Sequence, residues 1–237
     1  MPGSWDGSWR ARGVWRSVPD LLRVGVLVSG GGSNLQALVD ACHTGAIPAQ
    51  IATVVSNEPT AFALVRARRS GIGTAVFDHR TFASAEVFEA RIRAELEQQR
   101  VGLVCLAGFL RILSPRFVDA FAGRIMNIHP ALLPAFGGKG MYGERVHRAV
   151  LASGARVSGC TVHFVTAVPD AGPIIAQAVV PVDDDETPHT LAAKISREER
   201  RLYPLAVDLF AQGRLRVEGN RVRTLPPLGS GLVAETR

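Results

Sequence analysis

Asn127 and His129 stand two residues apart in the segment Met126-Asn127-Ile128-His129-Pro130, at the end of an apolar stretch. In a strand the side chains at i and i+2 point to the same face, so both groups reach one reacting centre. An amide that donates to a carbonyl oxygen and an imidazole near its protonated state together stabilise an oxyanion. The pair predicts acyl-type transfer. The alternative is a strand end whose polar side chains cap nearby backbone.

An acid that orients the imidazole is predicted at Asp170, in a turn bracketed by Pro169 and Gly172. Its carboxylate would stabilise the charged ring of His129 and help remove the proton from an attacking amine, directly or through water. The sequence therefore favours acyl transfer onto an amine. The alternative for Asp170 is a turn-forming residue whose side chain bonds only to its own backbone.

A metal site is a competing use of the imidazoles and the carboxylate. The side chains available to it are His129, His147, His163 and Asp170. The chain has neither H-x-x-x-H nor a Cys/His pair at ligand spacing, so we expect no metal. His163 alternates with apolar neighbours in a predicted strand, and it faces either the core or the site.

A glycine-rich turn, Ser29-Gly30-Gly31-Gly32-Ser33-Asn34, follows the first apolar stretch and opens a helix-like one. Free N–H groups and the helix dipole favour an anion at such a place. The turn is neither G-x-x-x-x-G-K-[ST] nor a full G-x-G-x-x-G, because Leu35 takes the place of the last glycine. It therefore predicts a monophosphate site rather than a nucleoside triphosphate or dinucleotide site. The alternative is a tight turn in which Ser33 caps the helix.

The elements that must position these groups alternate between strand and helix, which is typical of a parallel sheet with helical connections. The key pair then lies at the carboxyl end of a strand, where open α/β sheets bind ligands. Residues 137–143 predict a glycine-rich mobile flap, and residues 160–165 and 174–182 predict an antiparallel addition to the sheet. The predicted strands are 23–29, 51–56, 74–77, 103–107 and 125–129; the predicted helices are 33–46, 61–70, 84–99, 114–121, 144–153 and 187–211, the last with a bend at Pro204.

Composition and charge restrict the class of protein. With 237 residues, 47% of them hydrophobic and 20% charged, the chain suits one soluble α/β domain, and no apolar run approaches the ~18 residues of a membrane span. The formal charge of +6 divides into +2 for residues 1–23 and +3 for residues 214–237, which leaves +1 between them. A nearly neutral body argues against nucleic-acid binding.

Domain limits and cellular compartment follow from the same composition. Residues 1–22 predict an N-terminal extension outside the fold, 23–226 one domain, and 227–237 a C-terminal tail. The extension has no apolar core of a signal peptide. Three widely separated cysteines, Cys42, Cys105 and Cys160, fit a reducing cytoplasm. Small-molecule substrates and a monomer or homodimer are expected, with no membrane partner.

Five separated motifs resemble one known family. They read V-L-V-S-G-G-G-S-N-L-Q-A, L-A-G-F-L-R-I-L-S-P, N-I-H-P-A-L-L-P, G-C-T-V-H-F-V-T and D-A-G-P-I-I-A-Q, and Y-P-L follows them. In order, spacing and identity these motifs are similar to those of the folate-dependent glycinamide ribonucleotide formyltransferases of purine synthesis. The resemblance covers about residues 23–226. It implies a Rossmann-like sheet and formyl transfer from 10-formyltetrahydrofolate to the amine of 5-phosphoribosylglycinamide, with no metal.

The resemblance also implies a role for each matched residue. Asn127 and His129 would bind the formyl oxygen, Asp170 would handle the proton, and His163 matches a histidine near the catalytic acid. The substrate phosphate and ribose would be held by Gly32, Ser33, Asn34 and Glu199. The folate would be held by Leu110, Arg111, Ile112, Leu113 and Asn127, together with Thr166, Ala167, Val168, Pro169 and Asp170.

The sequence departs from some relatives at two places. Where these relatives carry a folate-binding Arg after the third strand, this chain has Ala85, with Arg80 nearby as a candidate substitute. The loop 137–143 is longer than in some relatives, so no substrate contact is transferred to it.

Three other functions were weighed against formyl transfer to the ribonucleotide. A formyltetrahydrofolate hydrolase uses the same chemistry but carries an N-terminal regulatory module, and only 22 residues precede the first predicted strand. A methionyl-tRNA formyltransferase is disfavoured because its Arg-Gly run after L-L-P is absent and no tRNA-binding domain follows. An RNA-binding module suits the basic ends but not the neutral body or the lack of exposed-aromatic RNA motifs.

Overall fold

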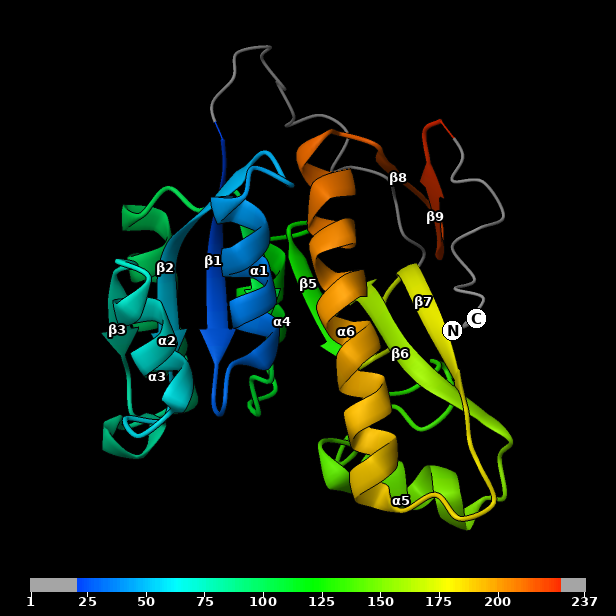
Figure 1. Cartoon of the computed structure of the whole chain (residues 1–237). Coiled ribbons are helices and arrows are strands. Elements are labelled where there is room, and N and C mark those ends of the chain that lie inside the picture. The colour runs from blue at the N-terminus through cyan, green and yellow to red at the C-terminus, as the bar shows by residue number, and fades with distance from the viewer. Residues whose placement is uncertain (1–20, 227–237) are drawn as a thin grey trace.

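A nine-stranded sheet with helices on both faces forms the protein, as the computed structural model shows for residues 21–226 (Figure 1). The predicted N-terminal extension, save for its last two residues, and the predicted C-terminal tail lie outside the described residues. The strands are β1 (Leu22–Val28), β2 (Ala49–Ser56), β3 (Thr74–Val76), β4 (Leu103–Leu106), β5 (Ile125–His129), β6 (Val157–Phe164), β7 (Ile174–Pro181), β8 (Leu215–Glu218) and β9 (Arg221–Thr224).

The helices connect the strands as the sequence predicts, with boundaries that differ by a few residues. They are α1 (Ser33–His43), α2 (Phe62–Arg69), α3 (Ala85–Gln98), α4 (Pro115–Ala120), α5 (Glu144–Ala152) and α6 (Pro188–Ala211), and a short 3-10 turn, η2, spans His79–Thr81. Ser114 caps α4, since its side chain accepts from the Phe117 N–H, and Pro115 takes the first helical position. Helix α6 passes through Pro204 as one continuous element.

The strand order is β3-β2-β1-β4-β5-β6-β7-β9-β8. β3, β2, β1, β4 and β5 run parallel, whereas β6 pairs antiparallel with β5 and β7 pairs antiparallel with β6. The predicted mostly parallel sheet with an antiparallel C-terminal extension is therefore confirmed. The chain turns from β1 outward to β3 and then returns to β4 on the other side of β1, and ligands bind at such a switch point.

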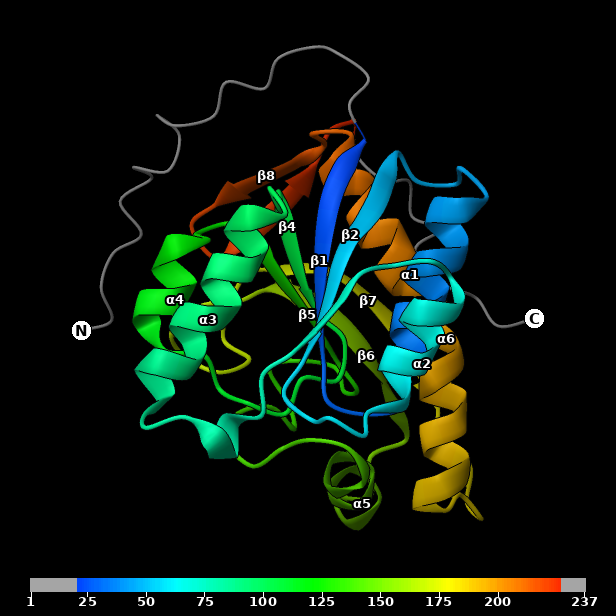
Figure 2. The same ribbon diagram turned by 90° about the vertical axis from the view of Figure 1, so that its left-hand side faces the viewer.

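Two apolar layers flank the sheet, because successive side chains of a strand face opposite sides. Val24, Val26 and Val28 pack into the layer covered by α1 and α6, whereas Leu27 faces the layer of α3 and α4. Figure 2 shows α3 and α4 on one side of the strands and α1, α2 and α6 on the other. The two layers fix the strand ends, and so fix the residues that follow them.

Tyr203 ties helix α6 to the strand ends beside the predicted catalytic pair. Its side chain is fully buried, and its hydroxyl donates toward the carbonyl oxygens of Leu106 at 3.1 Å and Met126 at 3.0 Å. These residues end β4 and precede Asn127 in β5. The central helix therefore restrains the backbone from which Asn127 projects.

The hairpin β8–β9 was not predicted. It joins the sheet beside β7, where Arg221 pairs with Ile174 in a parallel register. Two features of the sequence indicate it: Leu215, Val217 and Val222 alternate with arginines, and Gly219-Asn220 lies between the two strands. Within residues 21–226, no helix combines the length and the apolar character needed to cross a membrane.

Candidate active site

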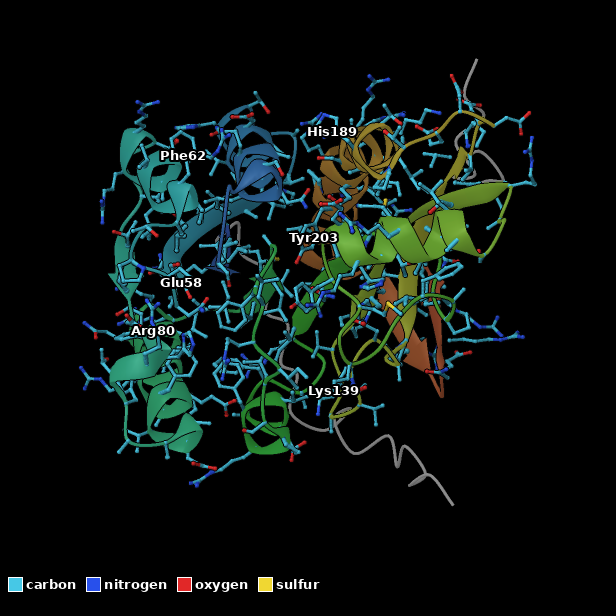
Figure 3. The ribbon with its side chains drawn as sticks, turned by 90° about the horizontal axis from the view of Figure 1, so that it is seen from below. Glu58, Phe62, Arg80, Lys139, His189 and Tyr203 are labelled. Carbon is cyan, nitrogen blue, oxygen red and sulfur yellow. The ribbon has the colours of Figure 1, made fainter. Side chains whose placement is uncertain are left out.

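A cavity of about 510 Å³ opens at the carboxyl ends of the parallel strands. Its walls are the turn after β1, the segment after β4, the end of β5, the loop 138–143, part of the turn 165–170 and one face of α6. Figure 3 views the molecule from this side and labels Lys139 of the loop. Six segments far apart in the sequence thus meet at one edge of the sheet.

All but one of the predicted site residues line this cavity. Val168 is the exception: it is absent from the lining, and 62% of its surface is exposed. The lining includes Gly32, Ser33, Asn34, Leu110, Arg111, Ile112, Leu113, Asn127, His129, His163, Thr166, Ala167, Pro169, Asp170 and Glu199.

Asn127, His129, His163 and Asp170 form one connected polar cluster. His129 Nδ1 lies 3.6 Å from one carboxylate oxygen of Asp170, and His163 Nε2 lies 3.6 Å from the other. The Asn127 amide nitrogen lies 3.1 Å from His163 Nε2. Asn127 and His163 are brought together because they are register partners across β5 and β6. His163 therefore faces the site rather than the core.

His163 orients the amide of Asn127. Its Nδ1 lies 2.9 Å from the carbonyl oxygen of Phe164, so Nδ1–H donates there. Nε2 lies between the Asn127 amide nitrogen and a carboxylate oxygen of Asp170, so the buried ring positions both groups. The Asn127 amide has two N–H groups, and at least one of them is left to donate to a ligand in the cavity.

The ring of His129 faces an oxygen acceptor at each nitrogen. Nε2 lies 2.9 Å from the Phe136 carbonyl oxygen, and Nδ1 faces Asp170. Burial lowers the pKa of His129, while Asp170 and the Phe136 carbonyl act in the opposite direction. In the free protein the neutral form of the His129 ring is therefore favoured, although the Phe136 carbonyl and the Asp170 carboxylate would both stabilise the charged form. The sequence predicts an imidazole near its protonated state, and the ring would reach that state only when negative charge develops nearby during a reaction.

Asp170 is held as a carboxylate. Burial disfavours its charge, but the His163 ring, the charge of His129 and the Gly138 N–H outweigh burial and lower the pKa of Asp170. The Gly138 N–H donates to Oδ2 at 2.8 Å. Asp170 has a φ of 56°, a left-handed conformation that Asp tolerates better than most residues. Such strain at a polar cluster accompanies functional sites.

The loop after β5 contacts both members of the His129–Asp170 pair. Phe136 provides the carbonyl that accepts from His129, and Gly138 provides the N–H that binds Asp170. Gly137 lies between them, where a Cβ atom would stand 2.5 Å from Leu133 Cδ2 and 3.1 Å from the Asp170 Cβ. Only glycine lets the loop approach the acid this closely.

The turn after β1 presents N–H groups to the cavity. Ala63 N–H donates to the Gly30 carbonyl at 3.0 Å, and Arg66 Nε donates to the Gly31 carbonyl at 2.9 Å. Across the described chain, no hydrogen bond uses the N–H groups of Gly31, Gly32 or Ser33. Carbonyls turned away and N–H groups left free make an anion site at the start of α1. Gly32, with φ of 74°, is the N-cap and has no side-chain cap, so Ser33 does not cap the helix.

Glu199 lies at the same end of the cavity. Asn34 Nδ2 donates to its Oε2 at 3.1 Å, and the other amide atom of Asn34, Oδ1, is buried without a protein partner. Burial raises the pKa of Glu199 to about 7. A carboxylate beside an anion cradle suits a phosphorylated polyol, since hydroxyl groups donate to the carboxylate while N–H groups bind the phosphate.

The segment after β4 forms the other end of the cavity. Leu110 is 57% exposed and Ile112 is 60% exposed, which is unusual for large apolar side chains. With Phe109 and Leu113 they make an apolar wall that suits a flat aromatic ligand. Arg111 is the one charged residue of this segment.

Several lining residues were missed from the sequence. On α6, Ala192, Ile195 and Ser196 line the cavity beside Glu199. Their spacing places them on one helix face, so the predicted Glu199 indicated its neighbours. Lys139, Met141 and Tyr142 come from the glycine-rich loop, and His147 follows on α5. No local pattern indicated these last contacts, because they depend on how the loop folds back.

Comparison with known proteins decides the family. Residues 22–207 match the family model described as formyl transferase. The chain belongs to the formyl transferase family. It is 42% identical over 212 residues to the phosphoribosylglycinamide formyltransferase of Escherichia coli strain K12, an alignment that spans 88% of this chain and 98% of that protein.

Solved structures of formyl transferases share the fold. The glycinamide ribonucleotide transformylase 1 of Symbiobacterium toebii is 46% identical, with a TM-score of 0.83 over 90% of this chain and 97% of that one. The formyltetrahydrofolate deformylase of Burkholderia mallei is 30% identical, with a TM-score of 0.78 over 88% of this chain and 72% of that one. Sequence identity thus favours the transformylases.

Arg80, the candidate substitute for a folate-binding Arg, is paired with carboxylates outside the cavity. Its guanidinium binds Asp78, with Nε 2.7 Å from Oδ1, and it approaches Glu58 at 3.4 Å. It does not line the cavity, and Figure 3 shows it beside Glu58, away from Lys139. Among residues 21–226, no group of three or more His, Cys, Asp or Glu side chains is arranged to hold a metal ion.

Proposed function

We propose that this protein transfers the formyl group of 10-formyltetrahydrofolate to the amine of 5-phosphoribosylglycinamide, a step of purine biosynthesis. The observation that carries the proposal is one cavity with an anion cradle at one end, an apolar wall at the other and the Asn127–His129–Asp170 cluster in between. The 42% identity to a formyltransferase of that name over nearly its whole length supports the same substrates.

The ribonucleotide would bind with its phosphate on the N–H groups of Gly31, Gly32 and Ser33. Its ribose hydroxyls would donate to Glu199, and its amine would point toward the cluster. The pterin of the folate would lie against the apolar wall formed by the segment after β4 and by part of the turn 165–170. This arrangement brings the amine nitrogen to the formyl carbon, and orientation of this kind is itself a large part of catalysis.

The reaction would proceed by attack of the amine nitrogen on the formyl carbon. As the new C–N bond forms, the formyl oxygen becomes an oxyanion. The free N–H of Asn127 and the positive charge of the His129 ring, which the developing charge favours, stabilise it. Asp170 takes the proton of the attacking amine, directly or through water. The bond from carbon to N10 of the folate then breaks, and the proton passes to N10, which leaves as a neutral amine.

The test is a coupled turnover assay with purified protein and 10-formyltetrahydrofolate. Tetrahydrofolate should form only when phosphoribosylglycinamide is present, in a 1:1 ratio with the formylated product. Equal folate turnover without the amine would contradict the proposal and indicate hydrolysis, the activity named for the Burkholderia mallei relative.

A further inference from the structure

Ser29 joins the two ends of the cavity without lining it. It follows β1 and immediately precedes the anion-binding turn. Its N–H donates to the Gly108 carbonyl at 3.1 Å, and its Oγ accepts from the Leu110 N–H at 2.9 Å. One residue therefore holds the start of the phosphate turn against the segment that forms the apolar wall.

The Ser29 hydroxyl is itself oriented from behind. Its Oγ donates to Asn57 Oδ1 at 2.6 Å, and Asn57 is only 2% exposed. Because the single hydroxyl proton is directed to Asn57, a lone pair is left for the Leu110 N–H. The buried Asn57 amide thus orients the Ser29 hydroxyl so that its oxygen accepts from the Leu110 N–H.

The wall segment, residues 108–113, is held by few hydrogen bonds. Beyond the two bonds to Ser29, its far end is held where the Ser114 N–H and hydroxyl donate to Glu89. Phe109 and Leu113 are buried in the layer of α3 and α4, whereas Leu110 and Ile112 are exposed. The hydrogen bonds at the two ends of the segment therefore help to decide how its exposed side chains lie.

The phosphate turn, in contrast, gains contacts only when an anion binds. Its carbonyls are already held by Ala63 and Arg66, whereas its N–H groups are free. An anion on those N–H groups would fix the turn, and Ser29 is the residue through which that restraint reaches residues 108–113.

We propose that Ser29 is a positioning residue through which a phosphate on the turn 30–33 tightens the folate-binding segment 108–113, and through which bound folate tightens the phosphate site. The inference rests on the proposed function, since it concerns how that function's two substrates bind together. Coupling between two sites is reciprocal, so each ligand raises the affinity of the other by the same factor.

The test measures folic acid binding by isothermal titration calorimetry, with and without saturating ribose 5-phosphate, which carries the phosphate and ribose but no amine. In the unmodified protein, ribose 5-phosphate should lower the folic acid Kd by about 5-fold or more. Ser29→Ala should reduce this factor below about 2-fold, and Ser29→Thr, which keeps the hydroxyl, should restore it. A factor that is unchanged in Ser29→Ala would overturn the proposal.

Glu89→Gln is the matched control, because Glu89 anchors the same segment without touching the phosphate turn. It should weaken folic acid binding to the same extent with and without ribose 5-phosphate, so the coupling factor stays at its original value. Loss of coupling in Glu89→Gln as well would mean that any damage to the segment has this effect, and would refute a specific role for Ser29. Ser29→Cys, of similar shape but weaker hydrogen bonding, gives the same comparison if Ser29→Ala does not fold.

Failure of the coupling is distinguishable from failure of the proposed function. If both ligands bind the unmodified protein but independently of each other, Ser29 has no coupling role while the proposed function stands. If neither ribose 5-phosphate nor folic acid binds, the proposed substrates are wrong, and the proposed coupling through Ser29 is refuted as well.

Discussion

The surroundings of His129 shift its pKa in opposite directions. Burial lowers its pKa, yet its two ring nitrogens face the Phe136 carbonyl and the Asp170 carboxylate, which are both acceptors. The charged form of the His129 ring is disfavoured in the free protein, although acceptors surround the ring. A developing oxyanion nearby would stabilise this charged form. Interactions that strengthen only in the transition state accelerate the chemical step. We therefore propose that His129 acts in the reaction rather than in substrate binding.

Replacing His129 by Ala should separate catalysis from binding. We expect kcat to fall by ~10² or more, as for loss of one oxyanion stabiliser. Affinity for ribose 5-phosphate, measured by calorimetry, should stay within about 2-fold, since the phosphate turn does not contact His129. Unchanged turnover would remove His129 from the mechanism.

Glu199 links function to stability through its proton. Its pKa is raised by burial to about 7 in the folded protein, above the ordinary value of 4.5. The folded protein therefore binds more protons than the unfolded chain between these values. The stability that this proton provides is complete below pH 4.5 and is lost as the pH rises to about 7.

Glu199→Gln should accordingly raise the free energy of unfolding at pH 8 by about 2 kcal/mol and change it little at pH 5. Gln mimics the protonated acid and still accepts from Asn34. Urea denaturation at the two pH values measures the difference. The variant should bind ribose 5-phosphate more weakly at pH 8, because it lacks the carboxylate that accepts from ribose hydroxyls. Equal destabilisation at both pH values would contradict a buried, reluctantly ionised Glu199.

Helices and strands were predicted correctly where their residues alone determine them. Alternating apolar stretches gave the parallel strands, and Ser114-Pro115 predicted the start of α4. The hairpin β8–β9 was missed because its two strands are only four residues long, so their alternation is a weak signal, and their burial comes from packing on the existing sheet. Ser33 was weighed as a helix cap on its residue type alone, whereas close packing of Ala63 on the turn puts Gly32 at that position.

The candidate site divides in the same way. Asn127 and His129 follow from a two-residue spacing within one strand, which the sequence displays directly. The position of His163 depends on the register between β5 and β6, and the lining by Lys139, Tyr142 and His147 depends on a loop that folds back over the cavity. Pairing register and loop conformation are tertiary properties, so the sequence of the loop alone did not reveal them.

The loop after β5 can be tested through Gly137. In Gly137→Ala the new methyl group would meet Leu133 Cδ2 and the Asp170 side chain, so the loop and the acid must move apart. We expect kcat to fall about 10-fold or more, because displacement of a catalytic group by about 1 Å is costly. Steady-state kinetics and thermal denaturation measure the two effects.

Gly73→Ala is the control for the Gly137 variant, since a Cβ at Gly73 meets nothing within 4 Å. It should leave both kcat and the melting temperature nearly unchanged. Full activity of Gly137→Ala would show that the close approach of the loop does not position Asp170.

Across the whole molecule, charge and cavity chemistry lie in different places. The cavity presents N–H groups, a half-buried carboxylate and apolar surface, whereas the basic residues between 214 and 224 belong to the hairpin β8–β9. Arg214, Arg216, Arg221 and Arg223 lie on or beside β8 and β9, and Glu218 pairs with Arg216 at 3.3 Å and Arg223 at 2.6 Å. The hairpin is thus a small basic patch that is partly neutralised by its own glutamate.

Nucleic-acid binding by this patch should be weak and limited to low salt. With so few uncompensated charges, few counterions are released, and nonspecific affinity for single-stranded RNA at about 50 mM salt should disappear by about 200 mM. The double variant Arg221→Glu/Arg223→Glu reverses the sign of the hairpin charge and should abolish the binding at low salt. Its formyl transfer should remain within about 2-fold of the original, since neither residue lines the cavity. Tight RNA binding at about 150 mM salt that survives the reversal would instead indicate a nucleic-acid surface elsewhere on the molecule.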